Sequence, residues 1–250
     1  MDTDTHLSKK IPAHTSHPLV DIVVSILIPS LILMKLSGEH MLGVSGGLLT
    51  ALAFPLGWGT YELITYKKYN VIALFGLISV LLTGGIGLLR VNTQWLAVKE
   101  AAIPGIIGIA ILISARSRYP FIKALLMNPS LFNVEKIHQK LLEHTSVELF
   151  EARLVRATYL LSGTFFFSSA MNYILAKWMV TSPTGSIAFN EELGRLTLFS
   201  YPIIALPAMM MTMAIAWYLW RNIRTLTGLT FEDALALKLQ EKYRVHDGVK

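Results

Sequence analysis

The chain contains no cysteine and few charged residues, 15% of the total, whereas 53% of its residues are hydrophobic. The lack of cysteine excludes disulfides, thiolate metal ligands and cysteine nucleophiles, and it leaves the redox compartment open. So low a charged fraction is atypical of a cytosolic domain and is typical of an integral membrane protein. We therefore expect long apolar segments, rather than a soluble core, to define the fold.

Signatures of catalysis and of cofactor or metal binding are also scarce. The metalloprotease pattern His-Glu-x-x-His does not occur, and no glycine-rich loop follows a strand to bind a nucleotide. The histidine pairs His14/His17 and His138/His144 lack the i, i+4 spacing that places two imidazoles on one helix face. We predict no catalytic residue, no cofactor site, no metal site and no enzymatic activity.

Six apolar stretches dominate what is present. Each approaches the length of about 20 residues that a helix needs to cross about 30 Å of hydrocarbon. The stretches cover residues 19–34, 41–58, 71–89, 96–114, 157–176 and 197–220. We predict an all-α fold, a polytopic membrane protein with six transmembrane helices arranged as three hairpins.

Basic residues fix the predicted orientation. Seventeen of the 22 Lys and Arg residues fall on one side when alternate loops are assigned to alternate sides. The positive-inside rule then places both termini in the cytoplasm. Because these residues follow the ends of the apolar stretches instead of forming one stripe, the net charge of +6 indicates membrane topology and no nucleic-acid partner.

Two amphipathic helices are predicted on the cytoplasmic side, which completes the domain plan. Residues 1–18 form a polar tail, residues 19–225 the six-helix domain with one amphipathic helix at about 130–152, and residues 226–250 a second amphipathic helix and tail. Val134, Ile137, Leu141, Thr145 and Leu149 share one face of the first. The hydroxyl of Thr230 can cap the second with Asp233 at the third helical position, and its stripe continues to Leu239 and Tyr243.

Small residues at a spacing of four let neighbouring helices approach closely. Three such faces occur, one on each of the second, third and fourth predicted spans: Gly43/Gly47/Ala51, Ser79/Thr83/Gly87 and Ala97/Ala101/Gly105. We expect them to pack within the bundle; a homo-oligomer is possible but is not indicated. Pro29, Pro55, Pro104, Pro202 and Pro207 lie within or near the spans, where proline tends to kink a helix.

Polar residues interrupt the apolar pattern at two places. Lys99 and Glu100 lie about one turn into the fourth span, soon after Asn92 and Trp95, and Arg195 precedes the sixth span. The fifth span carries Thr164, Ser168 and Asn172 at a spacing of four, which we expect to hydrogen-bond across helices or to line a wet cavity. A ligand or proton site would consist of Asn92, Trp95, Lys99, Glu100, Asn172 and Arg195. The alternative is an ion-pair network that only fixes helix ends.

The order of these features resembles the bacterial intracellular-septation family of inner-membrane proteins and its uncharacterised relatives. The resemblance covers about residues 40–225, with the segment from Gly84 through Asn92, Trp95 and Lys99 to Ser114 at its centre. Val98-Lys99-Glu100-Ala101 stands where the family has a Trp-Lys-Pro-Thr-like run. The resemblance implies a multi-pass protein of the bacterial inner membrane that supports cell-envelope maintenance or septation and has no known enzymatic activity.

Two functions follow as expectations. The first is envelope maintenance or septation through contacts with lipid or with other inner-membrane envelope proteins. The second is a small secondary transporter or lipid-handling protein, with a cavity between kinked helices. The transported or bound ligand, the oligomeric state and the partners stay open.

Overall fold

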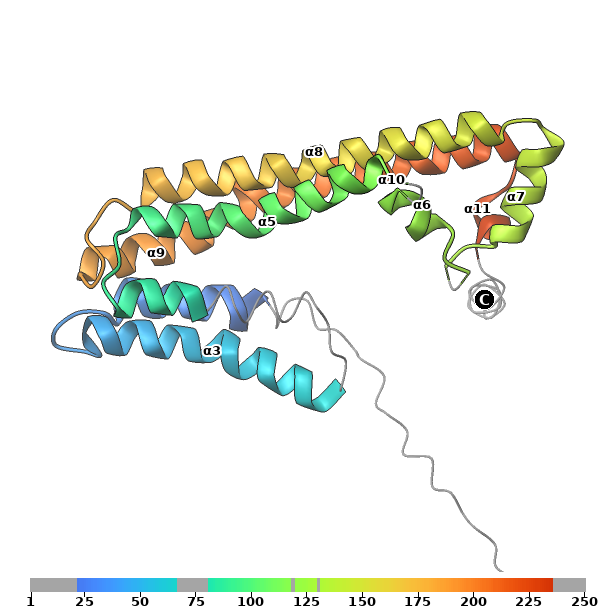
Figure 1. Cartoon of the computed structure of the whole chain (residues 1–250). Helices are drawn as coiled ribbons and strands as arrows, with labels where there is room; N and C mark the ends of the chain where they lie inside the picture. The colour runs from blue at the N-terminus through green and yellow to red at the C-terminus, as the bar shows by residue number, and fades with distance from the viewer. Residues whose placement is uncertain (1–21, 67–80, 118–119, 130, 236–250) are drawn as a thin grey trace, which may run out of the picture. The chain divides into compact units, whose positions relative to one another are not determined.

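The computed structural model describes residues 22–66, 81–117, 120–129 and 131–235. The predicted N-terminal tail, most of the predicted third span with Ser79, and the C-terminal residues Leu239 and Tyr243 lie outside the described residues. Every element in the described part is a helix, apart from one isolated bridge between Phe132 and Leu235, so the all-α prediction is confirmed there (Figure 1).

Within each described range, short connections join the helices. In chain order they are η1 (Val23–Leu27), α2 (Ile28–Lys35), α3 (Gly43–Tyr66), an unlabelled helix at residues 81–88, α5 (Gln94–Ala115), α6 (Phe121–Leu126), α7 (Val134–Glu143), α8 (Val147–Met179), α9 (Ile187–Ser200), η2 (Tyr201–Ala205), α10 (Leu206–Thr227) and α11 (Phe231–Ala234).

Two helices of the described residues are long and apolar enough to cross a membrane. They are Gln94–Ala115 and Ile187–Thr227, and they contain the predicted fourth and sixth spans. The second predicted span corresponds to Gly43–Trp58, an apolar part of α3 that is shorter than these two helices. The first lies in η1 and α2 and the fifth within α8, which starts ten residues before the predicted boundary at 157. The count of six spans therefore stays a prediction.

Prolines mark the irregular turns of these helices. Pro29 follows the π-helical turn η1, and Pro202 lies in the π-helical turn η2 between α9 and α10. Pro55 and Pro104 lie inside α3 and α5. Proline lacks the N–H that a regular turn donates, and a widened turn is one way to accommodate that loss without ending the helix.

The chain divides into two compact units. The first comprises Met1–Lys99 and Tyr173–Tyr201, and the second comprises Glu100–Asn172 and Pro202–Lys250. Helix α8 and the continuous helix from Ile187 to Thr227 each contribute a part to both units.

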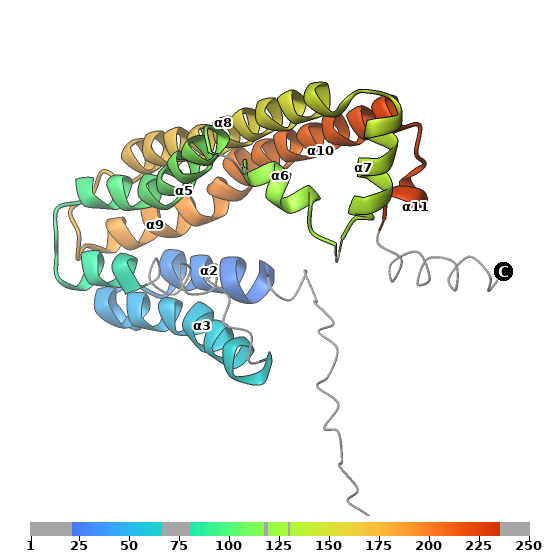
Figure 2. The ribbon, with the colours of Figure 1, turned by 45° about the vertical axis from the view of Figure 1, so that its right-hand side comes forward.

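In the first unit, α2 packs against α3 and α9 (Figure 2). A Cβ atom added to Gly47 would stand 3.1 Å from the Cα of Ser37, and one added to Gly194 would stand 2.8 Å from the carbonyl oxygen of Ser30. Residues 81–88 approach α3 equally closely, since a Cβ on Gly84 would stand 2.7 Å from Leu52 and one on Gly87 2.5 Å from Leu48. Of the predicted small residues, Gly47 and Gly87 therefore lie at close contacts, whereas a Cβ added to Gly43 would meet nothing within 4 Å.

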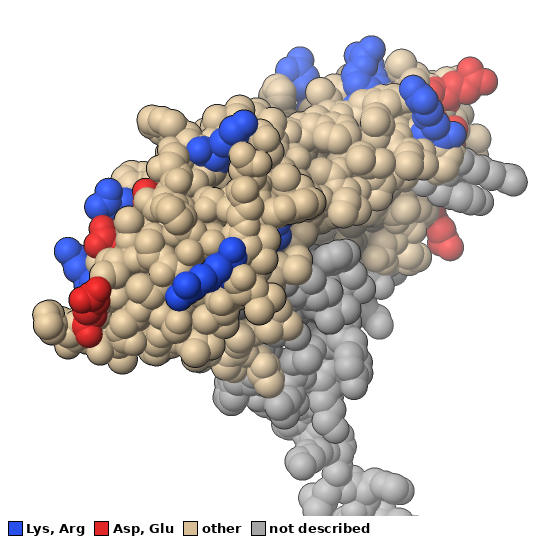
Figure 3. Space-filling model, turned by 60° about the vertical axis from the view of Figure 1, so that its left-hand side comes forward, with Lys and Arg blue, Asp and Glu red and all other residues tan. Residues whose placement is uncertain are grey.

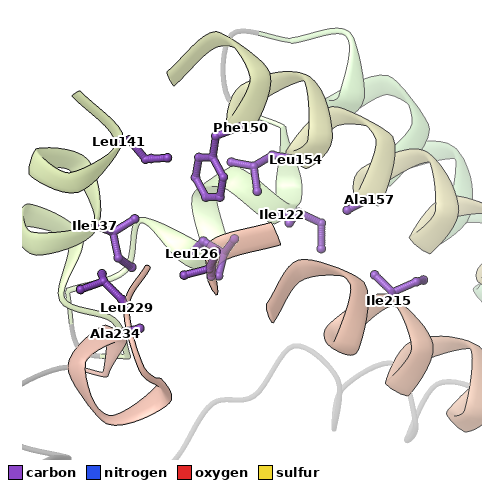
Figure 4. Packing of buried hydrophobic residues seen from close by; sticks show 11 residues of the cluster. Ile122, Leu126, Ile137, Leu141, Phe150, Leu154, Ala157, Ile215, Leu229 and Ala234 are labelled. Atoms are coloured by element: carbon purple, nitrogen blue, oxygen red, sulfur yellow. The ribbon is translucent and has the colours of Figure 1, made fainter. Parts of the chain in front are cut away.

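In the second unit, α5 packs against α8 through the small residues of the fourth predicted span. A Cβ on Gly105 would stand 3.0 Å from the hydroxyl of Ser169, and one on Gly108 would stand 3.3 Å from both Phe165 and Phe166. At one end of this unit the helices α6, α7, α8, α10 and α11 enclose a hydrophobic cluster (Figure 4). Its members include Ile122, Leu126, Ile137, Leu141, Phe150, Leu154, Ile223 and Leu229.

The predicted amphipathic helix at 130–152 is wrong in its extent. Helix α7 begins after Asn133, whose side chain accepts from the N–H of Lys136, and it ends at Glu143. Thr145 has a φ of 50°, and the N–H groups of Thr145 and Ser146 donate to the carbonyls of Leu142 and Leu141. This Schellman pattern stops the helix. Because α8 starts in a new register, Leu149 of the predicted stripe is exposed, and Phe150 enters the core instead.

The predicted cap at Thr230 is confirmed. Its hydroxyl accepts from the N–H of Asp233 at 3.3 Å and donates to the Asp233 carboxylate at 2.7 Å, and α11 begins at Phe231. The prediction of one continuous amphipathic helix from this cap is wrong at Leu235, because α11 ends at Ala234 and Leu235 is extended and bridges to Phe132. The ring of Phe231 meets Trp220 edge to face at a centroid distance of 5.2 Å. This contact holds α11 against α10.

Candidate functional site

The six residues of the predicted site divide between the two units. Asn92, Trp95, Lys99 and Arg195 belong to the first unit, whereas Glu100 and Asn172 belong to the second.

Asn92 and Trp95 lie at the start of α5. The Asn92 side-chain oxygen accepts from the N–H of Gln94 at 2.9 Å, which satisfies a donor that the first helical turn leaves unpaired. Trp95 is 60% exposed. An exposed tryptophan at a helix end is the arrangement that membrane proteins use at the bilayer interface.

Lys99 binds across to a neighbouring helix. Its ammonium donates to the hydroxyl of Thr83 at 2.6 Å, and both groups are partly buried. Thr83 belongs to the helix at residues 81–88, so this bond joins that helix to α5. A charged donor makes such a bond stronger than one between two neutral groups.

Arg195 and Glu192 of α9 have different roles. Arg195 forms an i, i+4 pair with Glu191 at 3.7 Å, and both side chains are exposed, so the pair adds little stability. The carboxylate of Glu192 instead accepts from the N–H groups of Thr181 and Ser182, both at 2.9 Å, and from the Ser182 hydroxyl at 2.7 Å. The carbonyl of Ser182 in turn accepts from the hydroxyl of Thr93 at 3.0 Å. Glu192 thus closes the loop between α8 and α9.

A buried asparagine that the sequence analysis missed lies near the start of α9. Asn190 is 0% exposed, and its amide nitrogen donates to the Ser37 hydroxyl at 2.9 Å and to the Val44 carbonyl at 2.8 Å. The Val44 carbonyl can only accept, which fixes the orientation of the amide. Asn190 Oδ1 and the hydroxyl of Ser30 are buried without a hydrogen-bond partner in the described part of the chain. Such unpaired groups are unusual in a protein interior.

Within the described residues, the polar stripe of the fifth predicted span bonds within its own helix and not across helices as expected. Thr164 donates to the carbonyl of Leu160, Ser168 to that of Thr164, and Asn172 to that of Ser168, all within α8. The bonds between helices come from other residues. Ser162 donates to the carbonyl of Gly108 at 2.9 Å, and Ser169 donates to that of Ala101 at 2.8 Å. Ser162 and Ser169 lie seven residues apart, the spacing of one helix face, opposite the small residues of α5.

Residues Gly43 to Gly47 spell Gly-Val-Ser-Gly-Gly, which fits the Gly-x-Ser-x-Gly pattern around some nucleophilic serines. The pattern indicates a catalytic serine only where it forms a sharp turn between a strand and a helix and where a histidine lies beside the serine. Ser45 lies in the first turn of α3 after a bend, and among the described residues its hydroxyl has no hydrogen bond to a histidine. Among the described residues, Ser45 therefore has neither the preceding strand nor the histidine partner of such a nucleophile.

Charged residues of the second unit gather at the end that holds the hydrophobic cluster. Within this unit, residues 101–115, 157–172 and 202–220 contain no Asp, Glu, Lys or Arg. Near the cluster, Lys123 pairs with Glu151 at 2.6 Å and Lys136 with Asp233 at 2.7 Å. Figure 3 shows wide areas of the visible face without a charged side chain.

The same end holds two carboxyl groups with shifted acidity. The Lys136 ammonium, followed by the Thr230 hydroxyl, lowers the pKa of Asp233 below its ordinary value of 3.8. The Lys140 ammonium likewise lowers the pKa of Glu143. Arg153 of α8 donates to the side-chain oxygen of the buried Asn222 of α10. The amide nitrogen of Asn222 donates to the Tyr218 carbonyl of its own helix at 2.7 Å. Together these bonds tie the helices around the cluster.

Among the described residues, no group of three or more His, Asp or Glu side chains is placed to hold a metal ion. Comparisons with protein-family models, with curated proteins and with solved structures give no match.

Proposed function

We propose that this chain is a six-span protein of the bacterial inner membrane, with both termini in the cytoplasm, that supports envelope maintenance or septation as a scaffold for membrane partners. Two helices long and apolar enough to span a bilayer support the membrane assignment. The charge-free stretches of the second unit support it as well, because charges within a bilayer are costly.

One observation favours a scaffold over a ligand site: three polar residues of the predicted site, Asn92, Lys99 and Asn172, bond to the helices themselves. Asn92 caps α5, Lys99 joins α5 to residues 81–88, and Asn172 bonds to its own helix. Glu192, three residues before Arg195 of the predicted site, closes a loop. These are roles in holding helices and loops in place, which is the task of a scaffold.

The experiment compares cells that lack the protein with cells that carry variants. A scaffold for septation or envelope maintenance predicts an envelope or division defect in the deletion strain, visible as altered cell length or sensitivity to detergent. The double variant Lys99→Ala, Glu100→Gln should restore the wild type, provided that it accumulates normally. Loss of rescue at normal protein levels would favour a ligand or proton site.

A transporter is the second candidate, and it rests on a different observation. The buried oxygens of Ser30 and Asn190 have no hydrogen-bond partner in the described part of the chain, and helices near them carry π-helical turns, which are frequent at functional sites. Purified protein in liposomes with a proton-sensitive dye tests it. Flux that Asn190→Ala abolishes would support transport, whereas no flux across a broad panel of solutes would count against it.

A further inference from the structure

A stripe of exposed apolar side chains runs along one face of α10 in the second unit. Leu206, Met210, Met213 and Trp217 follow one another at spacings of four, three and four residues, which places them on one helix face. Their exposed fractions are 43%, 67%, 61% and 60%. A soluble protein rarely leaves such a contiguous apolar stripe open, so the stripe marks a surface for lipid or protein.

Two arginines continue this face beyond the tryptophan. Arg221 and Arg224 lie four and seven residues after Trp217, and both are exposed. The Arg221 guanidinium lies over the Trp217 ring, 5.4 Å from its centroid. Stacking on an aromatic ring orients the guanidinium and leaves its edge N–H donors open to an anion.

Neither arginine has an anionic partner among the described residues, although carboxylates are present at the same end of the unit. Three of those carboxylates are engaged by lysines: Glu151 by Lys123, Asp233 by Lys136 and Glu143 by Lys140. Arg153 is engaged by Asn222. Internal pairing of the lysines thus leaves Arg221 and Arg224 as the positive charges that adjoin the apolar stripe.

We propose that this face of α10 binds an anionic phospholipid. Arg221 and Arg224 bind the headgroup phosphate, Trp217 lies at the level of the glycerol, and Leu206, Met210 and Met213 lie along the acyl chains. Guanidinium groups pair with phosphate oxygens through two parallel N–H donors, and tryptophan favours the bilayer interface. The order from methionines through tryptophan to arginines matches the order from acyl chain to headgroup. The assignment rests on the proposed membrane location.

Fluorescence of Trp217 tests the binding directly. A full-length variant with Trp58, Trp95, Trp178 and Trp220 changed to Phe keeps Trp217 as the one tryptophan. It is reconstituted in vesicles whose brominated lipid is either phosphatidylglycerol or phosphatidylcholine at the same mole fraction. Bromine quenches tryptophan only at close range, so stronger quenching reports enrichment of that lipid next to Trp217.

We expect phosphatidylglycerol to be enriched about fivefold for each arginine at low salt, and the enrichment to fall as salt is added. The double variant Arg221→Gln, Arg224→Gln should remove it. Arg156→Gln, which changes an exposed arginine of α8, is the matched control and should keep it.

Three other results of the quenching experiment would contradict the proposal. Equal quenching by both lipids would overturn the anionic-lipid site while leaving the membrane location intact. No quenching by either lipid would overturn the membrane location of this face as well. Enrichment that persists in the double variant would show that other residues attract the lipid and would overturn the assignment to Arg221 and Arg224.

Discussion

The hydroxyl of Ser169 on α8 donates to the carbonyl of Ala101 on α5 at 2.8 Å, beside Gly105, where an added Cβ would stand 3.0 Å from the same hydroxyl. The bond and the glycine depend on each other. A new methyl group at Gly105 would force this hydroxyl to shift and would strain its bond to Ala101. Close approach and interhelical bonding therefore come from one small region of the second unit.

This relationship predicts that Gly105→Ala destabilises the protein, by about 1–3 kcal/mol, because overpacking a tight contact forces side chains or backbone to shift. The measurement is thermal unfolding of purified protein in detergent. Gly163→Ala is the control, since a Cβ on this glycine of α8 meets nothing within 4 Å. It should stabilise the helix by about 0.5–1 kcal/mol. Similar effects of the two changes would contradict the packing.

Glu192→Gln should loosen the loop between α8 and α9. The carboxylate accepts from two backbone N–H groups and a hydroxyl, whereas an amide keeps only one acceptor oxygen and lacks the negative charge that strengthens these bonds. Hydrogen exchange at residues 181–186 should become faster. Glu191→Gln loses only an exposed pair at 3.7 Å and should leave exchange unchanged. Slow exchange in the Glu192 variant would show that other contacts hold the loop.

Asn190→Ala should cost about 1–3 kcal/mol of stability, because it leaves the buried Ser37 hydroxyl and the Val44 carbonyl without their donor. Thermal unfolding measures the loss. Thr225→Val serves as the control, since Thr225 is exposed and bonds only to its own helix, and its effect should stay within about 0.5 kcal/mol. An Asn190 variant as stable as the control would remove this residue from the packing of α2, α3 and α9.

Acid should weaken the attachment of α11 to α7. The pKa of Asp233 is lower in the folded protein than its ordinary 3.8, chiefly through Lys136. Its contribution to stability is therefore complete above the unfolded-state value, and it is lost as the pH falls through the folded-state value. Trp220, which contacts Phe231 of α11, should report the change by fluorescence below about pH 4. In Asp233→Asn the pH dependence should vanish; an unchanged titration would assign it to another carboxyl group.

Sequence reasoning succeeded where one local pattern decides the structure. The hydroxyl of Thr230 and the carboxylate of Asp233 three residues later are sufficient for a cap, and the apolar runs at 96–114 and 197–220 fall within the two long helices Gln94–Ala115 and Ile187–Thr227. Sequence reasoning failed where a side chain can choose between a hydrogen-bond partner in its own helix and one in another helix. The predicted spacing is present in Thr164, Ser168 and Asn172. Their side chains nevertheless donate to carbonyls of their own helix, because a backbone carbonyl one turn away is always available.

The residues that the sequence analysis missed share a physical reason. Asn190 bonds to Ser37, 153 residues away, and no periodicity within α9 identifies that partner. The break at Thr145 depends on one left-handed residue of a type that rarely adopts this conformation, so the apolar stripe seemed continuous to 152. Partners across helices and single backbone angles are set by the packing as a whole.

The central claim is the six-span topology, and the absence of cysteine allows a clean measurement of it. Single cysteines replace His40, Gln94, Thr184, Lys68, Ser117 and Glu232 in turn, and a membrane-impermeant maleimide is added to intact right-side-out vesicles. We predict that the cysteines at 40, 94 and 184 are labelled directly, and that those at 68, 117 and 232 are labelled only after the membrane is opened. Direct labelling of the second group, or protection of the first, would contradict the account.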